Sequence, residues 1–281
     1  TEKPDIGVFM DEWKALYESK SGERGIFNRE SAIKIAEQNG RRNTTDYDFG
    51  TNPCSEIILR NREFCNLSEV VVRPSDTRDT LLKKVRLATI LGTFQSTLVN
   101  FKYVSSSWKK NCEEERLLGV SLTGIMDCSL TNGKMDHNQG TLESLLQSLR
   151  DEAIKTNAEL AKKIGINQSV AVTCVKPSGT VSQLVDAASG IHARHNPYYI
   201  RTIRGDKKDP LTKMMKDNGF PLEDDIMNPS HTSVFSFPMK VNGTSVFRTD
   251  MTAIEQLEFW KIYQDNWCEH KPSVTISVKE S

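Results

Sequence analysis

The sequence has no surplus of charge of either sign, few cysteines and no long apolar run. Its 37 lysines and arginines balance its 37 acidic residues, so the formal net charge is zero. A neutral chain gives no electrostatic reason to expect nucleic acid or an anionic membrane as a partner. Because no apolar run approaches the length of a membrane span and no signal peptide opens the chain, we expect a cytoplasmic protein.

The six cysteines among 281 residues are scattered, and none belongs to a CxxC pair. Disulfide frameworks are typical of short secreted chains without a core, whereas the hydrophobic content of 37% is enough for a core here. A zinc site built on two cysteines would need two further ligands, and no second pair supplies them. His192 and His195 lie three residues apart without a cysteine or glutamate at zinc-site spacing, so we expect no bound metal.

The hydrophobic pattern predicts an α/β fold. Some segments carry apolar residues at helical spacing, and others carry β-branched or alternating apolar residues. The predicted helices are Val8–Ser19, Ser31–Asn39, Thr77–Phe101, Thr141–Ile164, Leu211–Asn218 and Thr252–Glu269. The predicted strands are Leu67–Val72, Leu117–Leu122, Ser169–Val175, Tyr198–Arg204, Val234–Phe237 and Val274–Val278. Strands that alternate with helices indicate βα units and a largely parallel sheet, and we expect residues 1–281 to form one domain or part of one.

One short stretch, Asn52-Pro53-Cys54-Ser55-Glu56, combines an amide, a thiol and a carboxylate, and Cys65 follows eleven positions after Cys54. In an extended or looped backbone, alternation would turn Asn52, Cys54 and Glu56 to one side. A nucleophilic cysteine would usually need a histidine base, and none of the five histidines lies near it in the sequence. Radical thiol chemistry would instead leave Glu56 free to take a proton from a substrate.

A second polar stretch lies between a predicted strand and the start of a helix. Its residues are Lys176-Pro177-Ser178-Gly179-Thr180-Val181-Ser182. Backbone N–H groups of a glycine-containing turn, with serine and threonine hydroxyls, can hold a phosphate at a helix N-terminus. The same residue types also cap helices without any ligand. The spacing of a Walker loop is absent, so the residues alone leave a phosphate site and a simple capped turn both open.

The Asn-Pro-Cys-x-Glu motif with its second cysteine resembles the active-site loop of ribonucleotide reductases. The best match is to the adenosylcobalamin-dependent, class II enzymes of the monomeric ribonucleoside-triphosphate reductase type. The stretches Ser19–Arg29, Lys176–Ser182 and Gly190–Arg204 resemble the same family. This resemblance implies part of a ten-stranded α/β barrel, with a finger loop that threads its centre and carries Cys54 at the tip.

The resemblance also implies roles for the residues of the loop. Cys54 would become a thiyl radical when the cobalt–carbon bond of adenosylcobalamin breaks, and would abstract the 3′-hydrogen of the ribose. Glu56 would take the proton of the 3′-hydroxyl, and Asn52 would orient the substrate. Cys65 would be one of two thiols that reduce the substrate radical as the 2′-hydroxyl leaves as water. The Pro177–Ser182 segment would bind the substrate phosphates.

The family pattern is incomplete in this sequence. The other reducing cysteine on an early barrel strand and the cysteine pair of the C-terminal tail are not identifiable. We therefore expect the chain to be roughly the C-terminal half of a barrel, with the remaining half and thioredoxin or a similar dithiol as partners. Alone, it should be inactive. Two alternatives stay open: a ribonucleoside-diphosphate reductase of another radical class, and a catalytically silent nucleotide-binding fragment.

Overall fold

The computed structural model describes residues 3–20, 25–134, 140–241 and 245–278. The helices are α1 (Ile6–Ser19), α2 (Arg29–Gln38), α3 (Arg78–Gln95), α4 (Ser106–Glu115), α5 (Leu142–Ile164), α6 (Thr180–Leu184), α7 (Pro210–Asp217) and α8 (Ala253–Asn266). The strands are β1 (Phe49–Thr51), β2 (Ile58–Arg60), β3 (Asn66–Val71), β4 (Leu118–Thr123), β5 (Thr173–Cys174), β6 (Tyr198–Asp206), β7 (Leu222–Asp224) and β8 (Thr232–Lys240). Short 3₁₀ helices span Ile125–Asp127 and Arg248–Asp250.

The centre of the molecule is a parallel sheet in the order β3-β4-β5. Its middle strand, β4, alternates large aliphatic residues with small or polar ones. Leu118 points toward α3, because its side chain lies 3.4 Å from where a Cβ on Gly92 would be. Since successive side chains of a strand point to opposite faces, Gly119 and Ser121 face the other way. This second face of the sheet carries the candidate site.

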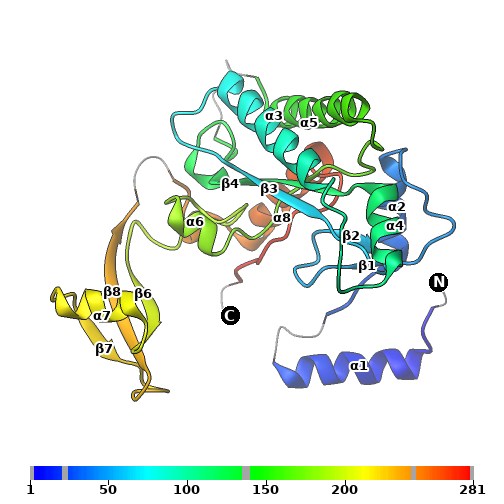
Figure 1. The fold of residues 1–281 in the computed structure, drawn as a ribbon. Coiled ribbons are helices and arrows are strands. Elements are labelled where there is room, and N and C mark those ends of the chain that lie inside the picture. Colours follow the sequence, from blue (N-terminus) through cyan, green and yellow to red (C-terminus); the bar gives the residue numbers. More distant parts are fainter. Residues whose placement is uncertain (1–2, 21–24, 135–139, 242–244, 279–281) are drawn as a thin grey trace.

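Helices cover the first face and close the core. α3 packs on β3 and β4, and α5 packs along α3, as Figure 1 shows above the sheet. The C-terminal end of α8 inserts two large aromatic residues that are fully buried. Trp267 donates its indole N–H to the Cys174 carbonyl at 2.7 Å, and the Tyr263 hydroxyl donates to the Thr131 carbonyl at 2.7 Å. Each aromatic side chain therefore buries its ring and keeps its polar group bonded.

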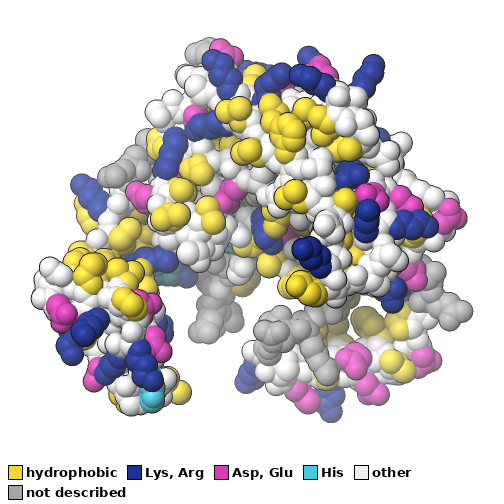
Figure 2. Space-filling model, in the orientation of Figure 1, with side chains coloured by type: hydrophobic (Ala, Val, Ile, Leu, Met, Phe, Trp, Pro, Cys, Tyr) yellow, Lys and Arg dark blue, Asp and Glu magenta, His cyan; other side chains and the backbone are white. Residues whose placement is uncertain are grey.

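Two parts of the chain lie away from this core in Figure 1. The antiparallel sheet β6-β8-β7 and α7 form a separate lobe, in which Phe235 is buried and Gly205 packs against Thr212. The first helix, α1, begins at the capping side chain of Asp5 and contains no buried residue. Large apolar side chains are also exposed on α3, where Figure 2 shows hydrophobic side chains gathered over the helix. They are Leu87, Leu91 and Phe94, and the exposed Leu98 follows just after the helix.

The α/β prediction is confirmed in its central units and wrong at particular elements. The helix predicted over Thr77–Phe101 ends at Gln95, because the following residues form short turns. The segment Val274–Val278 is not a strand. Just before this segment, Val175 is bonded to Lys271 and Ser273, but the amides of Thr275 and Ser277 are bonded to the side chains of His192 and Gln256.

The parallel pairing is also less extensive than predicted. It covers three strands, and the strand predicted over Ser169–Val175 is reduced to Thr173–Cys174. The described residues form a mixed α/β structure in which no barrel closes. None of the helices within these ranges is long and apolar enough to cross a membrane.

Candidate active site

A tight β-hairpin carries the predicted amide, thiol and carboxylate. β1 and β2 pair in antiparallel fashion, and the residues between them form the turn. The Ser55 amide donates to the Asn52 carbonyl at 2.9 Å, and Ser55 takes a left-handed conformation with φ of 61°. The chain therefore reverses at Cys54, whose side chain is exposed, while Glu56 is fully buried. A turn, and not an extended alternation, sets the directions of these side chains.

Asn52 and Glu56 are held together beneath this turn. The Asn52 side-chain amide donates to Glu56 Oε1 at 2.6 Å, while Asn52 Oδ1 accepts the Ile57 amide at 3.0 Å. One asparagine thus closes the hairpin and fixes the carboxylate. Glu56 Oε2 is buried and has no hydrogen-bond partner among the described residues.

Lys176 reaches the same carboxylate from a distant part of the chain. Its ammonium lies 2.7 Å from Glu56 Oε1, and its side chain is 28% exposed. Burial lowers the pKa of Lys176, but the hydrogen bond and charge of Glu56, with smaller contributions from Cys54 and Cys174, outweigh that effect and raise it. Glu56 therefore forms an ion pair with a lysine that follows β5 directly.

Buried ion pairs anchor the hairpin to α4. Arg42 Nη2 lies 2.5 Å from Glu115 and 3.4 Å from Glu63, and Arg42 also donates to the Ile58 carbonyl in β2 at 2.9 Å. Arg60 Nε lies 2.8 Å from Glu115. Burial, followed by the charge of Glu115, raises the pKa of Glu63 to about 9. The base of the hairpin is therefore fixed by charges that water does not screen.

The predicted reducing thiol, Cys65, lies just before β3 on the side of the sheet that faces the hairpin. Its sulfur and that of Cys174 each lie 3.2 Å from where a Cβ on Gly119 would be. Burial raises the pKa of both thiols, which favours the S–H forms that donate hydrogen atoms. Because β4 separates the two cysteines, their backbones are roughly 10 Å apart, which is beyond disulfide reach. Cys174 is a neighbour of Cys65 and not its disulfide partner.

The predicted phosphate turn lies where β5 leads into α6. The amides of Ser178 and Gly179 both donate to the Ser189 hydroxyl, at 3.0 and 3.3 Å. The Ser182 hydroxyl is buried and donates to the Gly179 carbonyl at 2.8 Å. Two amides of the turn therefore point to one position, where the Ser189 hydroxyl accepts their hydrogen bonds. Thr180 and Val181 are exposed at its surface.

A cavity of about 260 Å³ lies between β3, β4 and this turn. Its polar lining includes the buried hydroxyl of Ser178, whereas the Ser68 hydroxyl lies on the opposite face of the sheet, beside α3. Lys176 and Glu69 contribute charged groups, and burial raises the pKa of Glu69. A buried hydroxyl beside charged groups is suited to a hydroxylated, charged ligand.

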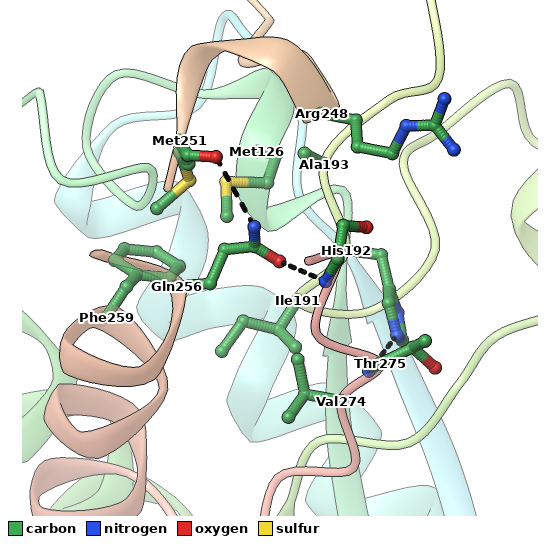
Figure 3. A pocket seen from close by; sticks show the side chains of 11 residues that line it. Met126, Ile191, His192, Ala193, Arg248, Met251, Gln256, Phe259, Val274 and Thr275 are labelled. Atoms are coloured by element: carbon green, nitrogen blue, oxygen red, sulfur yellow. Dashed lines mark hydrogen bonds between the residues drawn. The ribbon is translucent and has the colours of Figure 1, made fainter. Parts of the chain in front are cut away.

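A second cavity, of about 160 Å³, lies against α8 and the C-terminal segment (Figure 3). There His192 accepts the Thr275 amide at its Nε2 at 2.9 Å and contacts the Ser189 carbonyl at 3.0 Å through Nδ1. Both ring nitrogens are thus used by backbone groups, while His195 is exposed. In the part of the chain that the structure describes, no three His, Cys, Asp or Glu residues gather as metal ligands do.

The structure brings together residues that the sequence separates. Asn52, Glu56 and the 176–182 segment meet at one site, with Cys54 at its exposed edge and Cys65 on the sheet behind. Sequence reasoning missed the ion pair of Lys176, although a charged residue at the carboxyl end of a parallel strand is a usual position for a site. Part of the Ser19–Arg29 stretch, residues 21–24, lies outside the described residues.

Comparison with known proteins agrees with this architecture. A crystal structure of a B12-dependent, class II ribonucleotide reductase superposes with a TM-score of 0.67 at 28% identity, covering 82% of this chain and 35% of that one. The fold is therefore that of a ribonucleotide reductase catalytic subunit, represented in part. No protein-family model matches the sequence.

Two curated relatives define the family more closely. The adenosylcobalamin-dependent ribonucleoside-triphosphate reductase of Lactobacillus gasseri is 30% identical over 98% of this chain and 40% of its own length. The protein of the same name from Lactobacillus delbrueckii subsp. bulgaricus is 29% identical over 93% of this chain and 39% of its own length. The chain is thus homologous to the adenosylcobalamin-dependent, class II ribonucleotide reductases, and it spans about 40% of the length of these relatives.

Proposed function

We propose that this chain supplies the catalytic hairpin of a ribonucleoside-triphosphate reductase that forms 2′-deoxyribonucleotides through a thiyl radical on Cys54. The observation that carries the proposal is the arrangement at the hairpin: an exposed thiol at the turn, above a buried carboxylate that Asn52 and Lys176 hold in place. The reaction and the triphosphate substrate are proposed from the similarity to relatives that are named ribonucleoside-triphosphate reductases.

In the proposed reaction, Cys54 takes the hydrogen atom from C3′ of the ribose, and Glu56 takes the proton of the 3′-hydroxyl. A base on that oxygen assists loss of the 2′-hydroxyl, which leaves as water. Cys65 and a second thiol become a disulfide: one of their protons leaves with the 2′-hydroxyl as water, and one hydrogen atom goes to C2′. The remaining electron, with the proton held by Glu56, restores the 3′-hydroxyl and its carbon radical, and Cys54 then returns its hydrogen atom to C3′ and is again a thiyl radical. The raised pKa of Cys65 suits this role, because the S–H form carries the hydrogen atom.

The cavity beside the turn is the proposed seat of the substrate. The buried hydroxyl of Ser178 suits a ribose or phosphate oxygen, and the Lys176 ammonium adds positive charge. A phosphate that binds the amides of Ser178 and Gly179 would replace the hydroxyl of Ser189, which those amides now contact.

Adenosylcobalamin is the cofactor that the relatives' names imply, and it would supply the radical that oxidises Cys54. The described residues around Cys54 do not themselves form a corrin site, since the cavity beside them is about 260 Å³ and is lined by the sheet and the turn. The exposure of Cys54 nevertheless leaves its thiol accessible to a generator held elsewhere.

The remaining parts of the proposed enzyme are partners. The relatives are about two and a half times as long as this chain, so we propose that further polypeptide completes the barrel and provides the second reducing thiol. A thioredoxin or a similar dithiol would then restore both thiols after each turnover.

Reconstitution tests the proposal. The chain is combined with the complementary part of the reductase, adenosylcobalamin, a ribonucleoside triphosphate and a dithiol, and deoxynucleotide is measured. We expect turnover from the combination, none from the chain alone, and none from Cys54→Ser. Unchanged turnover by Cys54→Ser would exclude the radical role. Turnover with a diferric or glycyl-radical activating protein in place of adenosylcobalamin would assign the chain to another radical class.

A further inference from the structure

Two donors converge on one oxygen of the Glu56 carboxylate. The Asn52 amide lies 2.6 Å and the Lys176 ammonium 2.7 Å from the same atom, Oε1. The other oxygen, Oε2, is buried and receives no hydrogen bond from the described residues. Because Oε1 already accepts two hydrogen bonds and Oε2 accepts none, Oε2 is the oxygen of this carboxylate that is available to accept a proton.

The backbone of Lys176 is held on two sides. Its amide donates to the Ser121 hydroxyl at 2.9 Å, across the end of β4. On the other side its carbonyl oxygen packs against Gly190, where an added Cβ would lie only 2.6 Å away. Gly190 has a φ of 54°, a conformation that favours glycine. The backbone of the lysine is therefore fixed, so its side chain reaches Glu56 from a defined position at the end of β5.

We propose that Lys176 is a positioning residue that, together with Asn52, occupies Oε1 of Glu56 and leaves Oε2 as the atom that accepts the substrate proton. This inference rests on the proposed function. In the step, the O–H bond of the 3′-hydroxyl breaks, the proton bonds to Oε2, and the electron pair stays on the substrate oxygen. The ammonium of Lys176 keeps its protons throughout and touches no reacting atom.

The position of Lys176 in the chain gives the pair a second consequence. The residue directly precedes Pro177, the first residue of the proposed phosphate turn. A substrate seated on the turn by its phosphates is thereby placed at a fixed distance from the base, because one residue joins the two. Proton transfer depends on such placement, since a general base must lie within hydrogen-bond reach of the proton it removes.

The ion pair is tested on the chain itself, without any turnover. Nuclear magnetic resonance of the lysine ε-carbon follows the titration of Lys176, whose signal is assigned by its loss in Lys176→Arg. We expect titration above the ordinary lysine value of about 10.4. In Glu56→Gln the pKa of Lys176 should fall, because burial is then opposed only by the weaker effects of Cys54 and Cys174. Glu30→Gln, which removes an exposed partner of Lys34, should leave Lys176 unchanged. Equal titration in Glu56→Gln and the unsubstituted chain would overturn the proposal.

The positioning role is tested in the reconstituted reductase. Lys176→Met should lower kcat about 10- to 100-fold, a part of what a general base contributes, and change KM by less than about threefold. Lys176→Arg should recover most of the loss. An unchanged kcat in Lys176→Met, or equal losses in both variants, would overturn the role. If the unsubstituted reductase is inactive, the proposed function and the positioning role of Lys176 are both overturned. The titration would still show whether Lys176 and Glu56 form an ion pair.

Discussion

Asn52 donates its side-chain amide to Glu56 across 2.6 Å and accepts the Ile57 amide on its other side-chain atom. The residue thus ties the two ends of the turn together and orients the only carboxylate within it. Asn52, Cys54 and Glu56 are close in the sequence because one short turn holds all three side chains.

Asn52→Ala should lower the free energy of unfolding by about 1–3 kcal/mol, because Glu56 and the Ile57 amide lose a partner where both are shielded from water. Urea denaturation measures the change. Asn61→Ala, at an exposed position just after β2, is the matched control and should change stability by less than about 0.5 kcal/mol. Equal effects of the two substitutions would contradict the role of Asn52 in closing the turn.

Gly119→Ala should destabilise the chain by about 1–3 kcal/mol through overpacking. The new Cβ would lie 2.5 Å from a methyl group of Leu67 and 3.2 Å from the sulfurs of Cys65 and Cys174. Thermal unfolding compares it with Gly50→Ala in β1, where an added Cβ meets nothing within 4 Å. Combining Gly119→Ala with Leu67→Ala should recover part of the loss. A neutral Gly119→Ala would show that the sheet is not packed as described.

Arg42→Met should cost about 3–5 kcal/mol, because the buried carboxylate of Glu115 loses one of its two arginine partners, and the buried Glu63 and the Ile58 carbonyl lose a hydrogen-bond donor. Arg29→Met is the control, since Arg29 and Asp48 form an exposed ion pair, which contributes about 0–1 kcal/mol. Denaturant titration of both variants separates the two kinds of ion pair. Similar small losses would mean that the hairpin does not depend on the buried charges.

Stability should fall in acid partly because of His270. Burial is the main reason that the pKa of this histidine falls from 6.5 to about 3. Above pH 6.5 the histidine is neutral in both the folded and the unfolded chain. Between pH 6.5 and 3 only the unfolded chain binds the proton, so the free energy of unfolding decreases as the pH falls. Between pH 7.5 and 5 the loss amounts to about 2 kcal/mol.

His270→Gln should therefore flatten the decline of stability between pH 7.5 and 5, whatever its effect at neutral pH. His195→Gln, at an exposed histidine, should keep the slope of the unsubstituted chain. Urea denaturation at a series of pH values measures both. If His270→Gln retained the full slope, the buried neutral histidine would not be the source of the acid sensitivity.

The central elements β3, α3, β4 and α5 could be predicted from the sequence because their periodic apolar segments are long, whereas α4 was missed and β5 is shorter than predicted. The helix predicted over Thr141–Ile164 differs from α5 by one residue at its start, and Gly165 ends it in the left-handed conformation. The hairpin could not be predicted, because β1 and β2 have three residues each and too few positions to show a period. The segment Val274–Val278 was predicted as a strand because it is rich in β-branched residues. It is not one, because its amides are bonded to side chains and not to a neighbouring strand.

The site divides in the same way. Asn52, Cys54 and Glu56 could be recognised because a turn keeps them adjacent in the sequence. Lys176 stands 120 residues from Glu56, and only the pairing of β4 with β5 brings the two together. The sequence could not show which hydroxyls of the turn are exposed. The Ser182 hydroxyl, predicted as a phosphate ligand, is buried and donates to the Gly179 carbonyl.

The most direct test of a thiyl radical on Cys54 is electron spin resonance of the reconstituted reductase during turnover. The protein is prepared with ordinary cysteine and with cysteine deuterated at the β-carbon. The account predicts a radical signal that narrows on deuteration, since the unpaired spin couples to the β-hydrogens, and that is absent from Cys54→Ser. A signal that deuteration leaves unchanged, or one that persists in Cys54→Ser together with deoxynucleotide formation, would contradict it.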